Sequence, residues 1–164
     1  MSDLQGLVVR QANLADTQDA QALIQLMDHY ARDPMGGGSG LSDHSRRNLV
    51  EALHSRVGCW VLLAYLADEP VGLLTAIEGF STFRCQPLLN IHDLIVDRNH
   101  RGQGISRQLM AAIEQIALEQ GCCKLTLEVL EGNEIAQAAY RAFGFAGYQL
   151  DPKMGQALFW EKAL

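Results

Sequence analysis

The sequence has no long apolar run. No window approaches the roughly eighteen apolar residues that a membrane-spanning helix requires. The first residues, MSDLQGLVVRQ, also lack a basic stretch followed by an apolar one, which is the pattern of a secretory signal. We therefore expect a cytoplasmic protein that has no membrane partner.

Basic residues are in the minority, with 13 Lys and Arg against 19 Asp and Glu and a formal net charge of -6. A nucleic-acid-binding surface needs clustered Lys and Arg, so we expect no nucleic-acid partner. An acidic balance suits a cationic substrate, because charges of opposite sign attract the ligand toward the protein.

Cysteine is scarce. The four cysteines lack the paired spacing of a zinc site, and Cys122 and Cys123 are chain neighbours that could hardly bridge each other. We expect reduced, mostly buried thiols and no metal site.

Apolar residues, at 48% of the 164, are numerous enough for one domain, residues 1–164, with a single continuous core. Their spacing follows the periods of helices and strands. Helices are predicted over residues 17–32, 43–56, 105–120 and 133–143, and strands over residues 7–12, 59–67, 71–80, 88–97, 123–130, 145–150 and 156–164.

Connection lengths predict how the strands run. Short turns join the early strands, which should therefore be antiparallel. Strand 88–97, helix 105–120 and strand 123–130 should form a crossover unit with parallel strands. The predicted fold class is α/β (α+β), with a mixed, mostly antiparallel sheet of about seven strands and four helices on both of its faces.

The segment HRGQGIS, residues 100–106, joins a predicted strand to a predicted helix. Unpaired N–H groups and the positive end of the helix dipole meet there, and Gly102 and Gly104 let the backbone approach an anion closely. The alternative is that the glycines only form a tight turn. A dinucleotide fingerprint is excluded because Arg107 stands where its third glycine would be, and no GK[ST] of a mononucleotide P-loop follows.

Two motifs between Leu94 and Phe145 resemble the GNAT superfamily of acyl-CoA-dependent N-acetyltransferases. That family has an aliphatic strand leading into [RQ]-x-x-G-x-[GA], and this chain has LIVDRNHRGQGIS, with Ser106 at the last position. Farther along, the family has Asn, Ala, Tyr and Gly-Phe at set spacings. The matching residues here are Asn133, Ala136, Tyr140, Gly144 and Phe145.

The resemblance implies acetyl-CoA as cofactor and a set of residues that bind it. The backbone of the glycine loop would hold the pyrophosphate, and the pantetheine arm would lie along strand 88–97, where the sheet splays from strand 123–130 after a bulge. The N–H of Leu94 or Ile95 would then bind the thioester carbonyl. The implied cofactor-binding residues are Leu94, Ile95, Val96, Arg101, Gly102, Gln103, Gly104, Ile105, Ser106, Asn133, Ala136 and Tyr140.

The resemblance also suggests catalytic residues. Tyr140 would give a proton to the leaving thiolate, because a tyrosine with a pKa of about 10 is protonated at neutral pH. The alternative roles are a packed aromatic for Tyr140 and a helix N-cap for Asn133. His92 would take the proton of the amine, and the alternative is a structural histidine. Asp93 would assist or would fix nearby backbone, with Glu128 and Glu78 as substitutes for the base.

The stretch GFSTF…LLNIHDLIV also resembles polyamine and diamine acetyltransferases, where a Glu-Asp pair stands at His92 and Asp93. The acceptor amine would enter near the glycine-rich connection at residues 33–43. This connection is interpreted as a flexible loop, with a lid or an anion-binding nest as the alternative. Expected substrate-binding residues are His29, Tyr30, Asp33 and Glu128.

The leading hypothesis is an N-acetyltransferase in which a primary amine of a small molecule or peptide attacks acetyl-CoA directly, in a homodimeric protein. The alternative from another class is an acyl-CoA-binding sensor without turnover. A nucleotide-dependent transferase would need a metal-binding pair of acids that the sequence does not offer at a suitable spacing.

Overall fold

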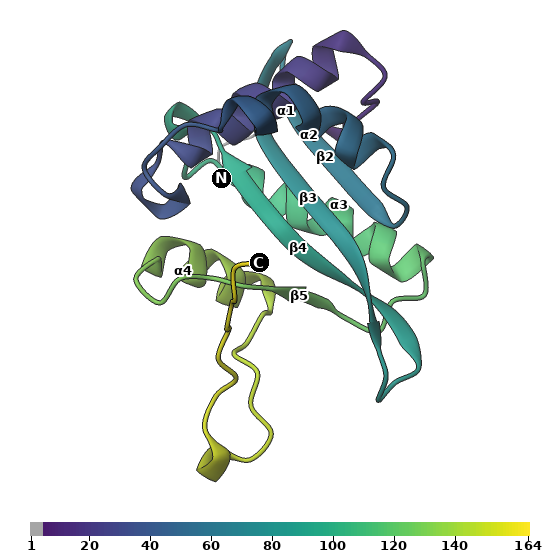
Figure 1. Cartoon of the computed structure of the whole chain (residues 1–164), viewed down its shortest axis with the longest axis vertical. Coiled ribbons are helices and arrows are strands. Elements are labelled where there is room, and N and C mark those ends of the chain that lie inside the picture. Colours follow the sequence, from purple (N-terminus) through teal and green to yellow (C-terminus); the bar gives the residue numbers. More distant parts are fainter. Residues whose placement is uncertain (1–4) are drawn as a thin grey trace. The chain divides into compact units, whose positions relative to one another are not determined.

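The structure is a computed structural model that describes residues 5–164, with one mixed sheet in the strand order β1-β2-β3-β4-β5 (Figure 1). The strands are β1 (Leu7–Gln11), β2 (Cys59–Leu66), β3 (Glu69–Ser81), β4 (Gln86–Val96) and β5 (Leu125–Leu127). The helices are α1 (Thr17–Ala31), α2 (Asp43–His54), α3 (Ile105–Glu119) and α4 (Glu134–Phe143), with short 3₁₀ turns η1 (Pro34–Gly36), η2 (Arg98–His100) and η3 (Pro152–Met154).

The chain divides into two compact units, and the boundary between them follows β5. Unit 1 runs to Leu127 and contains the whole sheet with α1, α2 and α3. Unit 2, Glu128–Leu164, contains α4 and η3. The expected single-domain organisation stays a prediction.

The sheet of unit 1 confirms the predicted mixture of strand directions. Strands β1 to β4 pair antiparallel in chain order, and β5 pairs with β4 in parallel after the crossover through α3. The predicted helices of this unit form within two residues of their expected ends, and Asp16 caps α1 through its side chain.

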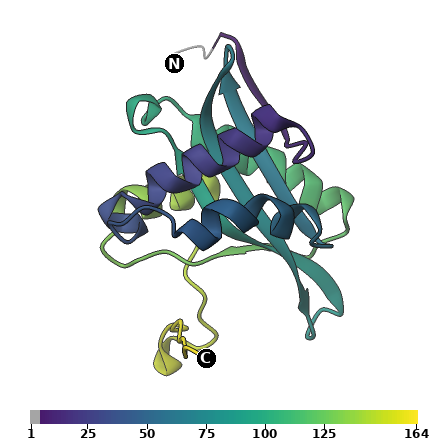
Figure 2. The ribbon, with the colours of Figure 1, turned by 45° about the horizontal axis from the view of Figure 1, so that its top comes forward.

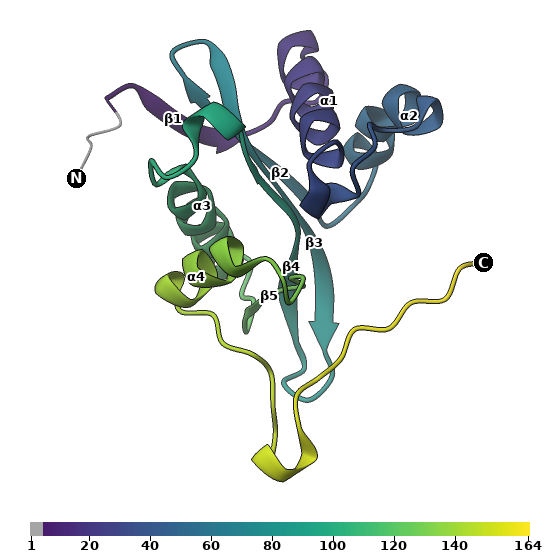
Figure 3. The ribbon, with the colours of Figure 1, turned by 90° about the vertical axis from the view of Figure 1, so that its left-hand side faces the viewer.

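Helices cover both faces of the sheet, as predicted. Figure 3 shows α1 and α2 on one face and α3 on the other, and Figure 2 shows α1 and α2 lying over the strands. The α1 face buries a cluster made of Ala22, Leu23, Leu26, Val61, Leu63, Tyr65, Leu73 and Ile95. Helix α3 buries Ile105, Leu109, Met110, Ile113 and Ala117.

A glycine in β3 sets how closely α3 approaches the sheet. A Cβ atom added at Gly72 would lie 3.0 Å from side-chain carbons of both Ile105 and Leu109. This distance is tighter than ordinary packing, so a larger residue would push the first turn of α3 outward. The start of α3 is therefore placed by direct backbone-to-helix contact.

The prediction of about seven strands is wrong in its count, because residues 5–164 form a sheet of five strands. Residues 145–150 and 156–164, predicted as closing strands, form no strand. They meet at one backbone hydrogen bond, from Ala157 N to Tyr148 O at 3.1 Å. Two isolated segments gain too few contacts to form a stable hairpin, and Leu150, Phe159 and Trp160 remain largely exposed.

The predicted strand at 123–130 is shorter than expected, with only Leu125–Leu127 in the ladder. The expectation that the cysteines are mostly buried is also corrected, since Cys85 is exposed and the other three are half-buried. All four are free thiols. Over residues 5–164, no helix is both long and apolar enough to cross a membrane, and no group of three or more His, Cys, Asp or Glu side chains is arranged to hold a metal ion.

Candidate functional site

A β-bulge interrupts the pairing of β3 with β4 at His92. Thr75 lies opposite Asp93 while the next residue, Ala76, lies opposite Ile91, so His92 has no position of its own in the ladder. Bulges bend a strand and redirect its side chains. The bulge expected on this strand is therefore present, and its extra residue is the histidine predicted as base, which is exposed to solvent.

Beyond the bulge, β4 loses its parallel neighbour. Strand β5 pairs with β4 only from Leu89 to Ile91, whereas β4 continues along β3 as far as Val96. In an antiparallel pair, alternate residues direct their N–H and C=O groups away from the partner. Within the described part of unit 1, residues 92–96 therefore present backbone groups at an edge that no strand covers, and the predicted splay is confirmed.

The glycine loop follows directly after this edge. Gly102 and Gly104 both adopt left-handed conformations, with φ values of 76° and 87°. Gly104 is the N-cap residue of α3, and no side chain caps this helix end in the described chain. An uncapped helix start leaves first-turn N–H groups available to an anion. The side chains of Arg98, Arg101 and Arg107 are exposed around it and add positive charge.

The Arg101 side chain does not extend freely from this loop. Its Nε donates to the carbonyl of Val96 at 3.2 Å, and its Nη2 donates to Asp33 Oδ2 at 3.1 Å. Asp33 is a buried residue that also accepts from the Met35 N–H. This backbone hydrogen bond outweighs the effect of burial and, with Arg101, lowers the pKa of Asp33.

A second contact joins α1 to η2. Asp97 lies between two imidazoles, with His29 Nδ1 at 3.0 Å from one carboxylate oxygen and His100 Nδ1 at 3.3 Å from the other. Burial by itself would raise the pKa of Asp97, but the N–H of Asn99 and the two histidines lower it. His29, an expected substrate contact, thus lies against the loop that leads to Arg101.

Asp93 lies on the α1 face of the sheet. It accepts a hydrogen bond from the Thr75 hydroxyl on the paired strand. Burial raises the pKa of Tyr30, and the negative charges of Asp93 and Asp33 raise it further. Tyr30 is therefore within electrostatic reach of both carboxylates. Cys59, on β2, is also half-buried on this side, and burial raises the pKa of its thiol.

Residues 33–43 form a hydrogen-bonded connection between α1 and α2. Asp28 accepts from the backbone N–H of Leu41 at 2.8 Å, from Arg32 at 3.0 Å and from Arg46. Near its start, the backbone of Gly36 lies against the carbonyl of Tyr30, where a Cβ atom would collide with the end of α1. This close approach explains one glycine of the GGG run.

The second motif lies in unit 2. Asn133 is the N-cap of α4, and its side chain accepts from the Ala136 N–H at 3.2 Å, which confirms the capping role. Gly144 ends the helix in a left-handed conformation. The ring of Tyr140 packs edge-on against Phe145, with centroids 6.0 Å apart. Tyr140 is half-buried, and Glu128 is the exposed first residue of this unit.

Unit 1 brings together many of the predicted site residues: His29, Tyr30 and Asp33 at the end of α1, and Asp93, the 92–96 edge and the glycine loop at the end of β4. Thr75, Asp97 and His100 also belong to this group and were not predicted from the sequence. Thr75 is the one polar residue in the buried run VGLLTA, a signal that could have indicated a partner for Asp93.

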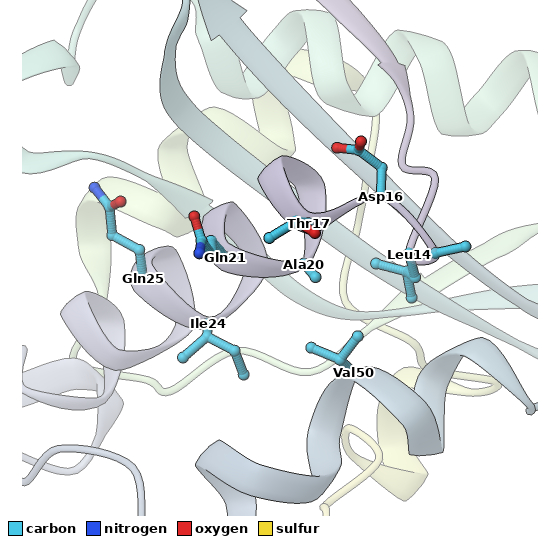
Figure 4. A pocket seen from close by; sticks show the side chains of 9 residues that line it. Leu14, Asp16, Thr17, Ala20, Gln21, Ile24, Gln25 and Val50 are labelled. Atoms are coloured by element: carbon cyan, nitrogen blue, oxygen red, sulfur yellow. The ribbon is translucent and has the colours of Figure 1, made fainter.

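A surface hollow of about 510 Å³ lies away from this group, between the N-terminal part of α1 and the middle of α2 (Figure 4). Ile24 and Val50 face each other across it, and Leu14 and Ala20 line it. The hollow is open to solvent. Its charged lining residue, Asp16, already caps α1 and is therefore not available to a ligand. We assign no role to it.

Comparison with known proteins identifies relatives of the chain. The sequence pattern of the acetyltransferase (GNAT) family matches residues 22–145. The chain is 37% identical to thialysine N-epsilon-acetyltransferase of Bos taurus over 66 residues, 40% of this chain and 38% of the relative. It is 44% identical to streptothricin acetyltransferase of Streptomyces lavendulae over 92 residues, 56% of this chain and 49% of the relative. The matched part thus spans half or less of these two relatives.

Solved structures share the fold. An aminoglycoside acetyltransferase from an uncultured soil metagenomic sample superimposes with a TM-score of 0.76 at 24% identity, covering 98% of both chains. A transcriptional regulator from Bacillus halodurans superimposes with a TM-score of 0.74 at 21% identity, covering 88% of this chain and 96% of that one. At such identities the likeness shows the fold alone, and a fold can serve different functions.

Proposed function

Because the chain belongs to the acetyltransferase (GNAT) family, we propose that it transfers an acetyl group from acetyl-CoA to the primary amine of a small molecule. One observation carries the proposal. In unit 1, an uncovered strand edge after a bulge leads within a few residues to an uncapped helix start with two left-handed glycines. A ligand with an extended arm that ends in a pyrophosphate could pair its arm with the strand edge and place its pyrophosphate at the helix start.

The chemistry of the loop fits a phosphate group. First-turn N–H groups and nearby arginines supply donors and positive charge. A Cβ atom at Gly102 or Gly104 would meet open space, so these glycines provide the left-handed turn and room beside it. Residues 101–106 would hold the pyrophosphate and residues 94–96 the pantetheine arm. From the resemblance of their motif, Asn133, Ala136 and Tyr140 are further proposed contacts of the cofactor.

Acetyl-CoA, when bound, supplies the acetyl group as an activated thioester. The backbone N–H of Leu94 or Ile95 is the proposed donor to the carbonyl oxygen, where negative charge develops. His92, exposed at the bulge, is the proposed base for the amine. Asp93, which accepts from Thr75, is proposed to assist catalysis or to fix the nearby backbone. Tyr140 is the proposed proton donor to sulfur.

Direct attack by the amine is favoured over an acetylated cysteine. Only a thiolate is a good nucleophile. Burial raises the pKa of Cys59 on the α1 face, and it also raises the pKa of Cys122. The thiol near Asp93 is therefore kept protonated, which supports a mechanism without a covalent enzyme intermediate.

The acceptor is proposed to be an amine-bearing small molecule such as a polyamine or an aminoglycoside. The relatives' names include thialysine, streptothricin and aminoglycoside acetyltransferases. The negative charge of Asp93 near Tyr30, and the net charge of -6, favour a cationic ligand. His29 and Tyr30 are the proposed contacts, and Glu128 is a further one suggested by the sequence.

The proposal is tested by release of free thiol from acetyl-CoA in the presence of diamines, polyamines, aminoglycosides, amino acids and peptides. We expect turnover with at least one cationic small amine. Tight binding of CoA without turnover on any amine of the panel would instead favour the acyl-CoA-binding sensor.

Replacing Gly104 by Ala should weaken CoA binding by about 5- to 30-fold, because a left-handed residue with a Cβ atom costs about 1–2 kcal/mol. Isothermal titration calorimetry measures this change. Gly121→Ala is the matched control, since Gly121 is also left-handed with open space but follows the other end of α3. Equal loss of affinity in both variants would contradict a specific role for the loop.

The expected homodimer stays a proposal. Unit 2 exposes Leu158, Phe159 and Trp160, each at more than 70% of the full side-chain surface. Exposed apolar groups of this size favour association. The chain has a mass of 18.1 kDa, and we expect light scattering to give twice this value. A monomeric mass at micromolar concentration would rule the dimer out.

A further inference from the structure

Asp33 is fixed at the end of α1 by its own backbone as well as by its side chain. Its N–H donates to the carbonyl of Tyr30 at 2.8 Å, and its carbonyl accepts from Gly36 at 2.8 Å and from Gly38 at 3.1 Å. One carboxylate oxygen caps η1 through the Met35 N–H at 3.0 Å. Asp33 is therefore a rigid point of unit 1, and its second oxygen faces Arg101.

Arg101 connects this fixed point to the glycine loop. It is the residue directly before Gly102, and its guanidinium bridges the carbonyl of Val96 and Asp33 Oδ2. The bridge closes the chain between the last residue of β4 and the first residue of the loop, with η2 between them. A guanidinium with two fixed partners holds the backbone of its own residue more firmly than a single contact does.

The contact between His29 and Asp97 is a second link between the same two segments of the chain. The end of α1 therefore contacts residues 97–101 at two points, and Tyr30, the proposed acceptor contact, lies between them in the chain. The acceptor side and the cofactor loop of unit 1 are thus joined by two side-chain contacts, each of which involves an aspartate.

We propose that Asp33 is a positioning residue that, through Arg101, holds residues 97–104 in the shape that binds acetyl-CoA. The inference rests on the proposed function. Both oxygens of the Asp33 carboxylate have protein donors, so its role is to orient Arg101. A loop that is ordered before binding loses less conformational entropy when the ligand binds, which raises affinity without a new contact.

The test is binding of CoA to the full chain by isothermal titration calorimetry, together with steady-state kinetics on any amine that is turned over. Asp33→Asn keeps the shape of the side chain and removes its charge. We expect the Kd for CoA and the KM for acetyl-CoA to rise by about 5- to 30-fold, with kcat within about twofold. Asp33→Glu should recover part of the affinity.

The matched control is Asp28→Asn. Asp28 is also an aspartate that accepts several hydrogen bonds next to the connection at residues 33–43. Its donors are Leu41, Arg32 and Arg46, and none of them belongs to the 97–104 loop. This variant should bind CoA like the wild type. Equal weakening by Asp28→Asn and Asp33→Asn would assign the effect to general loosening of the connection and overturn the inference.

A double-mutant cycle with Arg101→Gln tests whether Asp33 acts through Arg101. Arg101 is half-exposed, so its replacement should leave the fold intact even if Asp33→Asn does not fold. We expect Arg101→Gln to weaken CoA binding and Asp33→Asn to add little in its background. Independent, multiplicative effects, or wild-type affinity in Arg101→Gln, would overturn the inference. If the wild type itself does not bind CoA, the proposed function fails, and this result is distinct from failure of the variants.

Discussion

Replacing Tyr140 with phenylalanine lowers kcat by about 10- to 1000-fold and leaves the fold intact. The hydroxyl is the proposed proton donor to the leaving thiolate, and a lost general acid costs rates of this order. The phenylalanine ring preserves the edge-on packing against Phe145. The KM for acetyl-CoA should change much less than kcat, because the contribution of a proton donor is made in the transition state.

Tyr148→Phe is the matched control for this prediction. Tyr148 carries the same chemical group in the same unit, but it lies beyond α4 and is 61% exposed. Its variant should keep wild-type turnover. Steady-state rates for both variants, with circular dichroism as the check on folding, decide the outcome. Wild-type kcat in Tyr140→Phe would remove Tyr140 from the mechanism and leave it as a packed aromatic.

Replacing Asp19 with asparagine destabilises the protein by about 3 kcal/mol. Asp19 is 1% exposed in the first turn of α1. Both of its oxygens accept from Arg10, at 2.6 and 2.7 Å, and it also accepts from the Tyr65 hydroxyl and the Asn13 N–H at 2.7 Å each. An asparagine would direct an N–H₂ group at donors and leave buried partners unpaired, which is the costly way to break such a network.

Urea denaturation measures this loss as a lower free energy of unfolding. Arg32→Gln is the control, because the pair of Arg32 with Asp28 is an exposed contact within one helix, worth about 0.5 kcal/mol or less. A loss below about 1 kcal/mol for Asp19→Asn would contradict the structural role of the network.

The same network predicts a pH dependence of stability. The hydrogen bonds from Arg10, opposed by burial and aided by Asn13 and Tyr65, lower the pKa of Asp19 to about 2, below its unfolded value of about 3.9. A depressed pKa stabilises the folded state above the unfolded value, and this stabilisation of about 2 to 3 kcal/mol is lost as the pH falls from about 4 to about 2. In Asp19→Asn, the free energy of unfolding should fall less over this range. An unchanged acid slope would show that Asp19 is not the group that titrates.

Local sequence patterns were sufficient to predict the helices and to locate the two motifs. The caps at Asp16 and Asn133, the left-handed glycine after α4 and the apolar period of α3 are set by residues within a few positions of one another. These features depend on local hydrogen bonds and side-chain spacing, so a single sequence carries them. The same locality explains why the glycine loop and the Asn133 to Phe145 motif indicated the family.

The closing strands could not be predicted in this way. Residues 145–150 and 156–164 have the apolar alternation of strands, yet a strand also requires a neighbour with free backbone groups at the right place, and that neighbour is distant in sequence. The same reason limited the prediction for strand 123–130, of which only three residues find partners on β4.

The sequence by itself determined which elements form in unit 1, where its glycine loop lies and which residue types carry chemistry. Only the tertiary structure decided that His92 is the bulged residue, that Thr75 holds Asp93, and that Asp33 and Asp97 join the end of α1 to the loop before α3. Arg101 and Asp33 are 68 residues apart in the chain. No periodicity reports a contact over such a separation, because the contact exists only after α1 has packed on the sheet that contains β4.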